Sequence, residues 1–167
     1  MATKSAVTAL ANEDAGIVNQ DAIATKAKVA AIAFTIEKLA DNTDGDQIQI
    51  AKVHSDWSVL SIKLDNDALT GATGVDIGLW SDAPPAEAVA IDDDCYASAI
   101  SLASALDWAE QGFEARDLSA VGQKVWQDAG LTERPSGGAW YRMALQLDTG
   151  GAATGTISGI IEVALPS

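Results

Sequence analysis

Residues 140–165, WYRMALQLDTGGAATGTISGIIEVAL, contain two alternating apolar and polar runs separated by a small, glycine-rich segment. The apolar positions of the first run are Tyr141, Met143, Leu145 and Leu147. Those of the second run are Ile157, Ile161, Val163 and Leu165, in phase with Gly159. Strict period-two alternation predicts two strands, each with one buried face. Because the segment between them is short and polar, we expect a β-hairpin that closes the fold.

The same alternation recurs in the first half of the chain. It predicts strands from Val29 to about Lys38, at Gln47–Val53, at Trp57–Asp65 and around Val75–Leu79. The connections are short and rich in Asn, Asp and Gly, which suit turns. Repeated short strands with polar turns are typical of an antiparallel sandwich. We therefore expect a mainly all-β, antiparallel β-sandwich or jelly-roll-like domain with one or two short helices, formed by residues 27–167.

The middle of the chain interrupts this pattern. We expect a loop at 81–90, an edge strand at Cys95–Leu102 and a helical turn at Ser104–Gly112. The strongest helix signal covers Asp117–Ala129, where apolar residues recur at helical spacing and Gly130 follows as a stop.

The first 26 residues keep no steady apolar period. We interpret them as an N-terminal arm that is extended or disordered alone and that a partner could order. A short helix between Asp14 and Lys28 is an open alternative, because alanine is permissive of helix.

Charge is the most informative global property. The chain has 24 acidic and 10 basic residues, a net charge of −14. Nucleic-acid surfaces need clustered Lys and Arg, so we expect no nucleic-acid partner. The acidity fits a self-repelling, solvated surface or a salty medium. There is no apolar run long enough for a bilayer and no secretory-type start, so we expect no membrane association.

The residues suited to catalysis do not form a recognisable motif. His54 is the single histidine, and no G-x-S-x-G accompanies it, so a turn histidine is the simpler interpretation. Cys95, the single cysteine, follows three aspartates whose field would raise its thiol pKa, which favours a structural cysteine. We therefore expect no enzyme activity.

Three acidic clusters could in principle hold a hard cation. They are Asp41/Asp44/Asp46, Asp65/Asp67 and Asp92/Asp93/Asp94. None follows the EF-hand order, and Asp is also a common turn residue. We expect no bound metal and no cofactor.

The chain has five tryptophans, many for its length. Such side chains serve protein interfaces, sugar-stacking platforms or ordinary core packing. Trp57 and Trp140 fall on the polar phase of their strands, and with Trp80 they are our candidate partner-interface residues.

The segments VGQKVWQDAGLTERP and WYRMALQLDTGGAATGTISGIIEVAL resemble the C-terminal third of small head proteins of tailed bacteriophages. AFTIEKLADNTDGDQIQIAKVHSDWSVLSIKLDNDALTG and VDIGLW are similar to the strands of the same group. The resemblance implies a virion structural protein, made in the host cytoplasm, that decorates (cements) the outer capsid surface. It also implies a β-rich homotrimer that binds the major capsid protein, and it implies no catalytic residue.

Two alternatives remain open from the sequence. One is a head–tail or tail component, and the other is a carbohydrate-binding β-sandwich module that uses exposed tryptophans.

Overall fold

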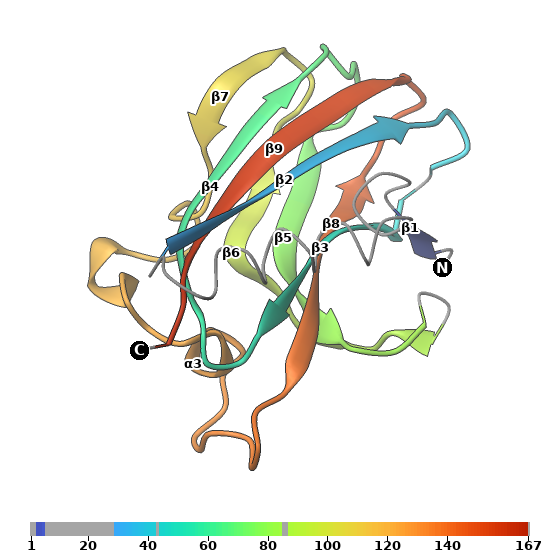
Figure 1. Cartoon of the computed structure of the whole chain (residues 1–167). Coiled ribbons are helices and arrows are strands. Elements are labelled where there is room, and N and C mark those ends of the chain that lie inside the picture. Colours follow the sequence, from blue (N-terminus) through green and yellow to red (C-terminus); the bar gives the residue numbers. More distant parts are fainter. Residues whose placement is uncertain (1–2, 6–28, 43, 85–86, 167) are drawn as a thin grey trace.

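The chain forms nine strands and two short helical turns in the part that a computed structural model describes, residues 3–5, 29–42, 44–84 and 87–166 (Figure 1). The strands are β1 (Thr3–Ser5), β2 (Val29–Lys38), β3 (Asp46–His54), β4 (Ser58–Asn66), β5 (Gly74–Ser81), β6 (Ala90–Ile100), β7 (Leu106–Glu110), β8 (Trp140–Thr149) and β9 (Gly155–Ala164). The helical turns are η2 (Leu118–Ala120) and α3 (Val125–Asp128). The strands expected from the alternating pattern are thus confirmed, with bounds shifted by a residue or two. The edge strand expected at Cys95–Leu102 is β6, which begins five residues earlier, at Ala90.

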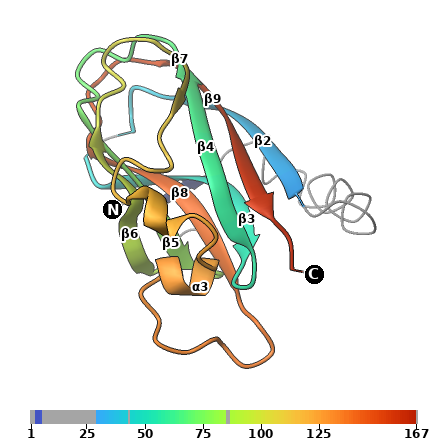
Figure 2. The ribbon, with the colours of Figure 1, turned by 90° about the vertical axis from the view of Figure 1, so that its left-hand side faces the viewer.

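Two sheets pack face to face. One has the order β1-β3-β8-β5-β6 and the other the order β2-β9-β4-β7. Figure 1 shows β2, β9, β4 and β7 as one layer with the other sheet behind it, and Figure 2 shows both layers from the side. Apart from β1, every ladder is antiparallel. The ladders β2·β9, β3·β8, β4·β7 and β5·β6 nest inside one another, as in a jelly roll.

The expected C-terminal hairpin is wrong. β8 pairs with β3 and β5, whereas β9 pairs with β2 and β4 in the opposite sheet. The five residues between the two strands are enough to cross the roughly 10 Å between packed sheets. The predicted faces are nevertheless right, because both strands point their apolar residues into the same core. Alternation identifies the buried face of a strand but not its neighbours.

A buried lysine fastens this crossing. Lys38, at the end of β2, is fully buried, and its Nζ donates to the carbonyl oxygens of Gly151 and Ala153 at 2.9 Å each. Burial lowers the pKa of the Lys38 ammonium. These hydrogen bonds join the end of β2 to the loop between β8 and β9.

The predicted helix at Asp117–Ala129 is also wrong, because only two single turns form there. Gly122 takes a φ of 88°, outside the helical region, and Lys124 is extended with φ −81° and ψ 150°. The helical turn expected at Ser104–Gly112 is replaced by β7. Pairing with β4 overrides the local preference in that segment.

Part of the expected N-terminal arm is described. Thr3–Ser5 form β1, which pairs in parallel with Gln47–Gln49 at the edge of the larger sheet. The possible helix between Asp14 and Lys28 lies outside the described residues. Within the described part of the chain, no helix has the length and apolar character needed to cross a membrane.

We predict that Ile161→Asp prevents folding. Ile161 is completely buried in β9, and an unpaired carboxylate in the core costs several kcal/mol, a large share of a domain's stability. The matched control is Ile160→Asp, because Ile160 is half-buried on the opposite face of the same strand. Circular dichroism and thermal melting of both variants test this. A cooperative melt for Ile161→Asp would contradict the strand's orientation.

Candidate functional site: an aromatic end of the sandwich

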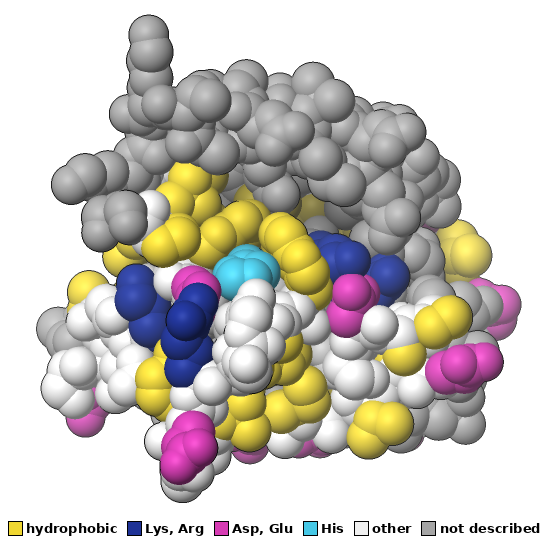
Figure 3. All heavy atoms as spheres, turned by 60° about the horizontal axis from the view of Figure 1, so that its bottom comes forward, with side chains coloured by type: hydrophobic (Ala, Val, Ile, Leu, Met, Phe, Trp, Pro, Cys, Tyr) yellow, Lys and Arg dark blue, Asp and Glu magenta, His cyan; other side chains and the backbone are white. Residues whose placement is uncertain are grey.

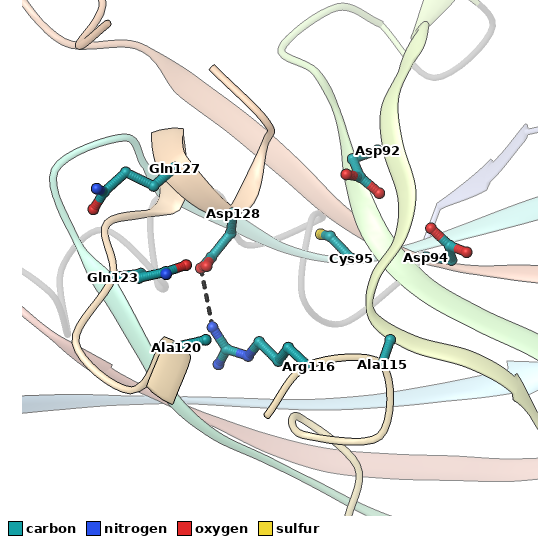
Figure 4. Close-up of a pocket in the computed structure, with 9 residues that line it drawn as sticks. All are labelled: Asp92, Asp94, Cys95, Ala115, Arg116, Ala120, Gln123, Gln127 and Asp128. Carbon is teal, nitrogen blue, oxygen red and sulfur yellow. Dashed lines mark hydrogen bonds and ion pairs between the residues drawn. The ribbon is translucent and has the colours of Figure 1, made fainter. Parts of the chain in front are cut away.

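A shallow hollow of about 340 Å³ lies between β6, the segment after β7, and α3. Figure 4 shows Asp92 and Asp94 on the β6 side, and Arg116 pointing toward Asp128 on the other side. Burial, and then the neighbouring Asp94, raise the pKa of Asp92. The hollow is thus lined by carboxylates and amides, and its one guanidinium is already bonded.

Arg116 ties four segments together. Its Nε donates to the Gly112 carbonyl at 2.7 Å, one terminal nitrogen to Val59 O at 2.9 Å and the other to Asp128 at 3.1 Å. The guanidinium also lies 4.7 Å from the ring centroids of both Tyr96 and Phe113. An arginine whose donors are used in this way stabilises the fold and has little capacity left for a ligand.

Cys95 also lines this hollow and is unsuited to nucleophilic chemistry. Burial is the main cause that raises the pKa of its thiol, and the charge of Asp92 adds to it. The raised thiol pKa confirms the direction expected from the sequence, although burial outweighs the predicted acidic field. A thiol that stays protonated near neutral pH does not act as a nucleophile.

The acidic clusters singled out in the sequence serve turns in two cases. Asp44 accepts a hydrogen bond from Gly150 N at 2.9 Å, and Asp67 accepts one from Thr156 N at 2.9 Å. Among the described residues, no three side chains of the ligand type are grouped to hold a metal ion.

The third cluster adjoins a buried carboxyl. Asp76 in β5 is 6% exposed and accepts a hydrogen bond from Ala99 N at 2.6 Å. Burial raises the pKa of Asp76 to about 6, and the nearby Asp148 and Asp94 add to the rise. Asp148 and Asp93 are in turn joined through Gln146, whose amide donates to both.

A different group of residues forms the surface best suited to a partner. At the end of the sandwich where β3 finishes and β8 begins, His54 is the cross-strand partner of Trp140. The imidazole lies 5.0 Å from the Trp140 ring, edge to face, and Trp57 packs edge-on against Trp140 at 5.4 Å. Trp140 is 40% exposed, whereas Trp57 is buried beneath it. Trp140 is therefore partly exposed to solvent while it packs against the rings of His54 and Trp57.

Backbone hydrogen bonds hold this end rigid. Ser55 is completely buried: its N donates to Ala139 O, its hydroxyl accepts from Ala139 N, and its O accepts from Trp126 N. These bonds join the turn after β3 to the start of α3 and to the loop before β8. Gly138, with a φ of 79°, lies directly against the His54 ring, where a Cβ would be 2.5 Å from Cε1.

Cationic side chains flank the rings. Arg134 binds Asp56 through two nitrogens, and the first cause of the lowered Asp56 pKa is this hydrogen bond. Lys52 bonds Asp82 at 2.8 Å, and its Nζ lies 5.4 Å from the centre of the Trp140 ring. Figure 3 shows the single histidine between hydrophobic side chains, with Lys and Arg on both sides. We call these residues, Lys52, His54, Trp57, Arg134 and Trp140, the aromatic end.

The structure treats the three predicted tryptophans differently. It brings Trp57 and Trp140 together, with only Trp140 offering substantial surface. Trp80 is fully buried on the face of β5 opposite the core, so it presents no side-chain surface and we remove it from the candidate interface. Sequence reasoning missed Lys52 and Arg134. Lys52 shares the phase of His54 in β3, but its position beside Trp140 depends on the register of β3 with β8.

Comparison with known proteins gives a fold but no family. No family model matches the chain, and no curated protein matches it. A chain of the solved "Capsid of Ralstonia phage GP4" superposes with a TM-score of 0.58 and 18% identity, covering 83% of this chain and 85% of that one. A chain of the "Cyanophage Pam1 capsid asymmetric unit" has a TM-score of 0.48 and 17% identity over the same shares. The first likeness shows a shared fold.

We predict that Asp76→Asn stabilises the protein at neutral pH. The pKa of Asp76 is raised on folding, so the native state holds a proton that the unfolded chain releases between about pH 4 and 6. The free energy of unfolding therefore falls as pH rises through that window. The amide keeps an acceptor for Ala99 N, so we expect a gain on the order of 2 kcal/mol at pH 7.5 that shrinks near pH 4.

Urea unfolding at both pH values tests this, with exposed Glu133→Gln as the control. An equal effect of Asp76→Asn at both pH values would refute the proposed titration.

Proposed function

We propose that this chain is a non-enzymatic structural protein of a tailed-phage virion, a decoration (cement) protein that binds the major capsid protein on the outer head surface as a homotrimer. The observation that carries the proposal is the shared fold with a chain of a phage capsid over 83% of this chain's length. The sequence resemblance to phage head proteins points the same way and was drawn from residues alone.

The architecture suits a protein that binds through preformed surfaces. Nested antiparallel ladders make a rigid sandwich, so its surfaces are ordered before binding and lose little conformational entropy on contact. Repeating a modest contact in each copy of an oligomer multiplies it through avidity.

The charge supports the outside of the head over the inside. With a net charge of −14, the chain is repelled by packaged DNA, whose phosphates favour basic partners. On the outer surface the same charge keeps particles apart in solution.

The described polar groups favour a structural role over a catalytic one. Arg116 is used by three acceptors, and the His54 ring accepts a hydrogen bond from Asp56 N through Nδ1 at 3.2 Å. The carbohydrate-binding alternative needs an open tryptophan face. Lys52 lies over the ring of Trp140, so the face on which a sugar would stack is shared with a cation.

We predict that the purified protein binds mature capsids lacking it and saturates at a fixed ratio to the coat protein. Sedimentation with quantification of both chains measures that ratio. The Glu133→Gln variant, altered at an exposed side chain, should bind at the same ratio.

A few copies per particle would instead indicate a head–tail or tail component. No binding would refute the capsid role, and glycan titration followed by tryptophan fluorescence would then test the carbohydrate-binding alternative.

We also predict that removing residues 1–26 leaves a folded sandwich with weaker capsid attachment. The truncation removes from the described structure only β1, a three-residue edge strand outside the eight nested strands. Thermal melting should show a cooperative transition, and the same sedimentation assay should show a higher dissociation constant. Unchanged affinity would exclude the arm from the mechanism.

A further inference from the structure

Trp108 has a conformation that tryptophan rarely adopts. Its φ is 48°, in the left-handed region, and its side chain is 45% exposed. The left-handed region costs a non-glycine residue roughly 1–2 kcal/mol, and for a bulky side chain it is an outlier. Such strain persists only where surrounding structure imposes it, and it gathers at functional positions.

A β-bulge imposes it. Leu64 pairs with Ala109 and Asn66 pairs with Leu106, so a step of two residues on β4 is matched by a step of three on β7. The extra residue lies at Asp107–Trp108, on a strand at the edge of its sheet. Bulges at sheet edges redirect a side chain and are typically kept for a purpose.

Contacts within the described chain do not explain the position of the indole. Among those residues, Trp108 has no ring–ring or cation–π partner and no side-chain hydrogen bond. A strained backbone therefore holds a large apolar ring with nearly half of its surface in water.

The surroundings of Trp108 are acidic. Asp107 precedes it and is exposed, and Asp65 lies opposite the bulge on β4. Glu110 follows in the same strand, but its carboxylate already accepts hydrogen bonds from Ser61 Oγ, Ile62 N and Gly112 N. Lys63, opposite Glu110, is the nearby cation. We call Asp65, Asp107 and Trp108 the Trp108 edge. In contact with a partner it calls for an apolar surface bordered by positive charge.

The aromatic end has that chemistry. There Trp140 is 40% exposed, and Lys52, which pairs with Asp82, lies over its ring. Arg134 pairs with Asp56, and Lys124 is a further cation near that carboxylate. The two surfaces are separate: β7 and the loop before β8 lie at opposite ends of the view in Figure 1. One copy therefore carries both halves of a complementary contact.

We propose that the Trp108 edge of one copy docks on the aromatic end of the next copy. Such a head-to-tail contact uses different surfaces on the two partners, and it closes into a ring when the rotation between copies allows. A ring of three would be the trimer of the proposed function. The inference rests on the homotrimer of the proposed function and deepens it by naming the two surfaces that form the contact.

The test is the mass of the full chain by sedimentation velocity over a range of concentrations, without capsids. The wild-type chain should form a closed oligomer. Trp108→Gly should lower the association constant by about thirtyfold or more, as for a central aromatic anchor. Glycine accepts the left-handed φ, so the variant should melt no lower than the wild type. Leu39→Ala, which alters a 48%-exposed side chain elsewhere, should keep the oligomer.

Variants of the aromatic end test the other side of the contact. Trp140→Ala should also give monomers. Arg134→Glu should do so as well, because it reverses one exposed charge and leaves the packed rings in place. The Trp108→Gly variant retains an intact aromatic end, and the Trp140→Ala variant retains an intact Trp108 edge. Their mixture should therefore form a dimer with one copy of each.

Three results would overturn the proposal: a monomeric wild-type chain, an oligomer that survives both tryptophan substitutions, or a mixture that stays monomeric. Because these readouts involve no capsid, failure here would be distinguishable from failure to bind the head.

Discussion

The pairing of the first strand of the sandwich with the last is the constraint on which the rest of the structure depends. β2 and β9 pair along their whole length, from Val29 with Ala164 to Lys38 with Gly155. Once these distant segments pair, the chain between them forms a long antiparallel loop. The ladders β3·β8, β4·β7 and β5·β6 lie successively within that loop. The buried ammonium of Lys38 fixes the same junction to the loop before β9, so loop and ladder support each other.

This nested pairing of strands brings turns that are distant in the sequence to the same end of the sandwich. The turn after β3 and the start of β8 are more than eighty residues apart, yet His54 and Trp140 are direct neighbours in the ladder. Ser55 then bonds α3 and the loop before β8 to that turn. The aromatic end is therefore a rigid product of the topology, and this rigidity makes it suitable for assembly.

Charge and strain divide the surface into unlike regions. The chain is strongly acidic overall, but Lys52 lies over the exposed ring of Trp140, and Arg134 pairs with Asp56 at the same end of the sandwich. At the edge formed by β7, a bulge holds Trp108 in a costly conformation among carboxylates. A molecule whose two exposed tryptophans, Trp108 and Trp140, lie in differently charged surroundings is suited to contacts with copies of itself.

The sequence by itself determined most of the strands and their buried faces, but not β1 or β7. It also showed no recognisable catalytic motif. Period-two alternation reports a local property, the side of the strand that leaves water, and it placed Met143 and Ile161 correctly in the core. Only the tertiary structure decided which strands are neighbours, because partner choice depends on contacts between distant residues. For that reason the hairpin was mispredicted, Trp80 became buried, and the cations near Trp140 could not be foreseen. The left-handed φ of Trp108 likewise arises from a register shift between two strands, which neither strand encodes alone.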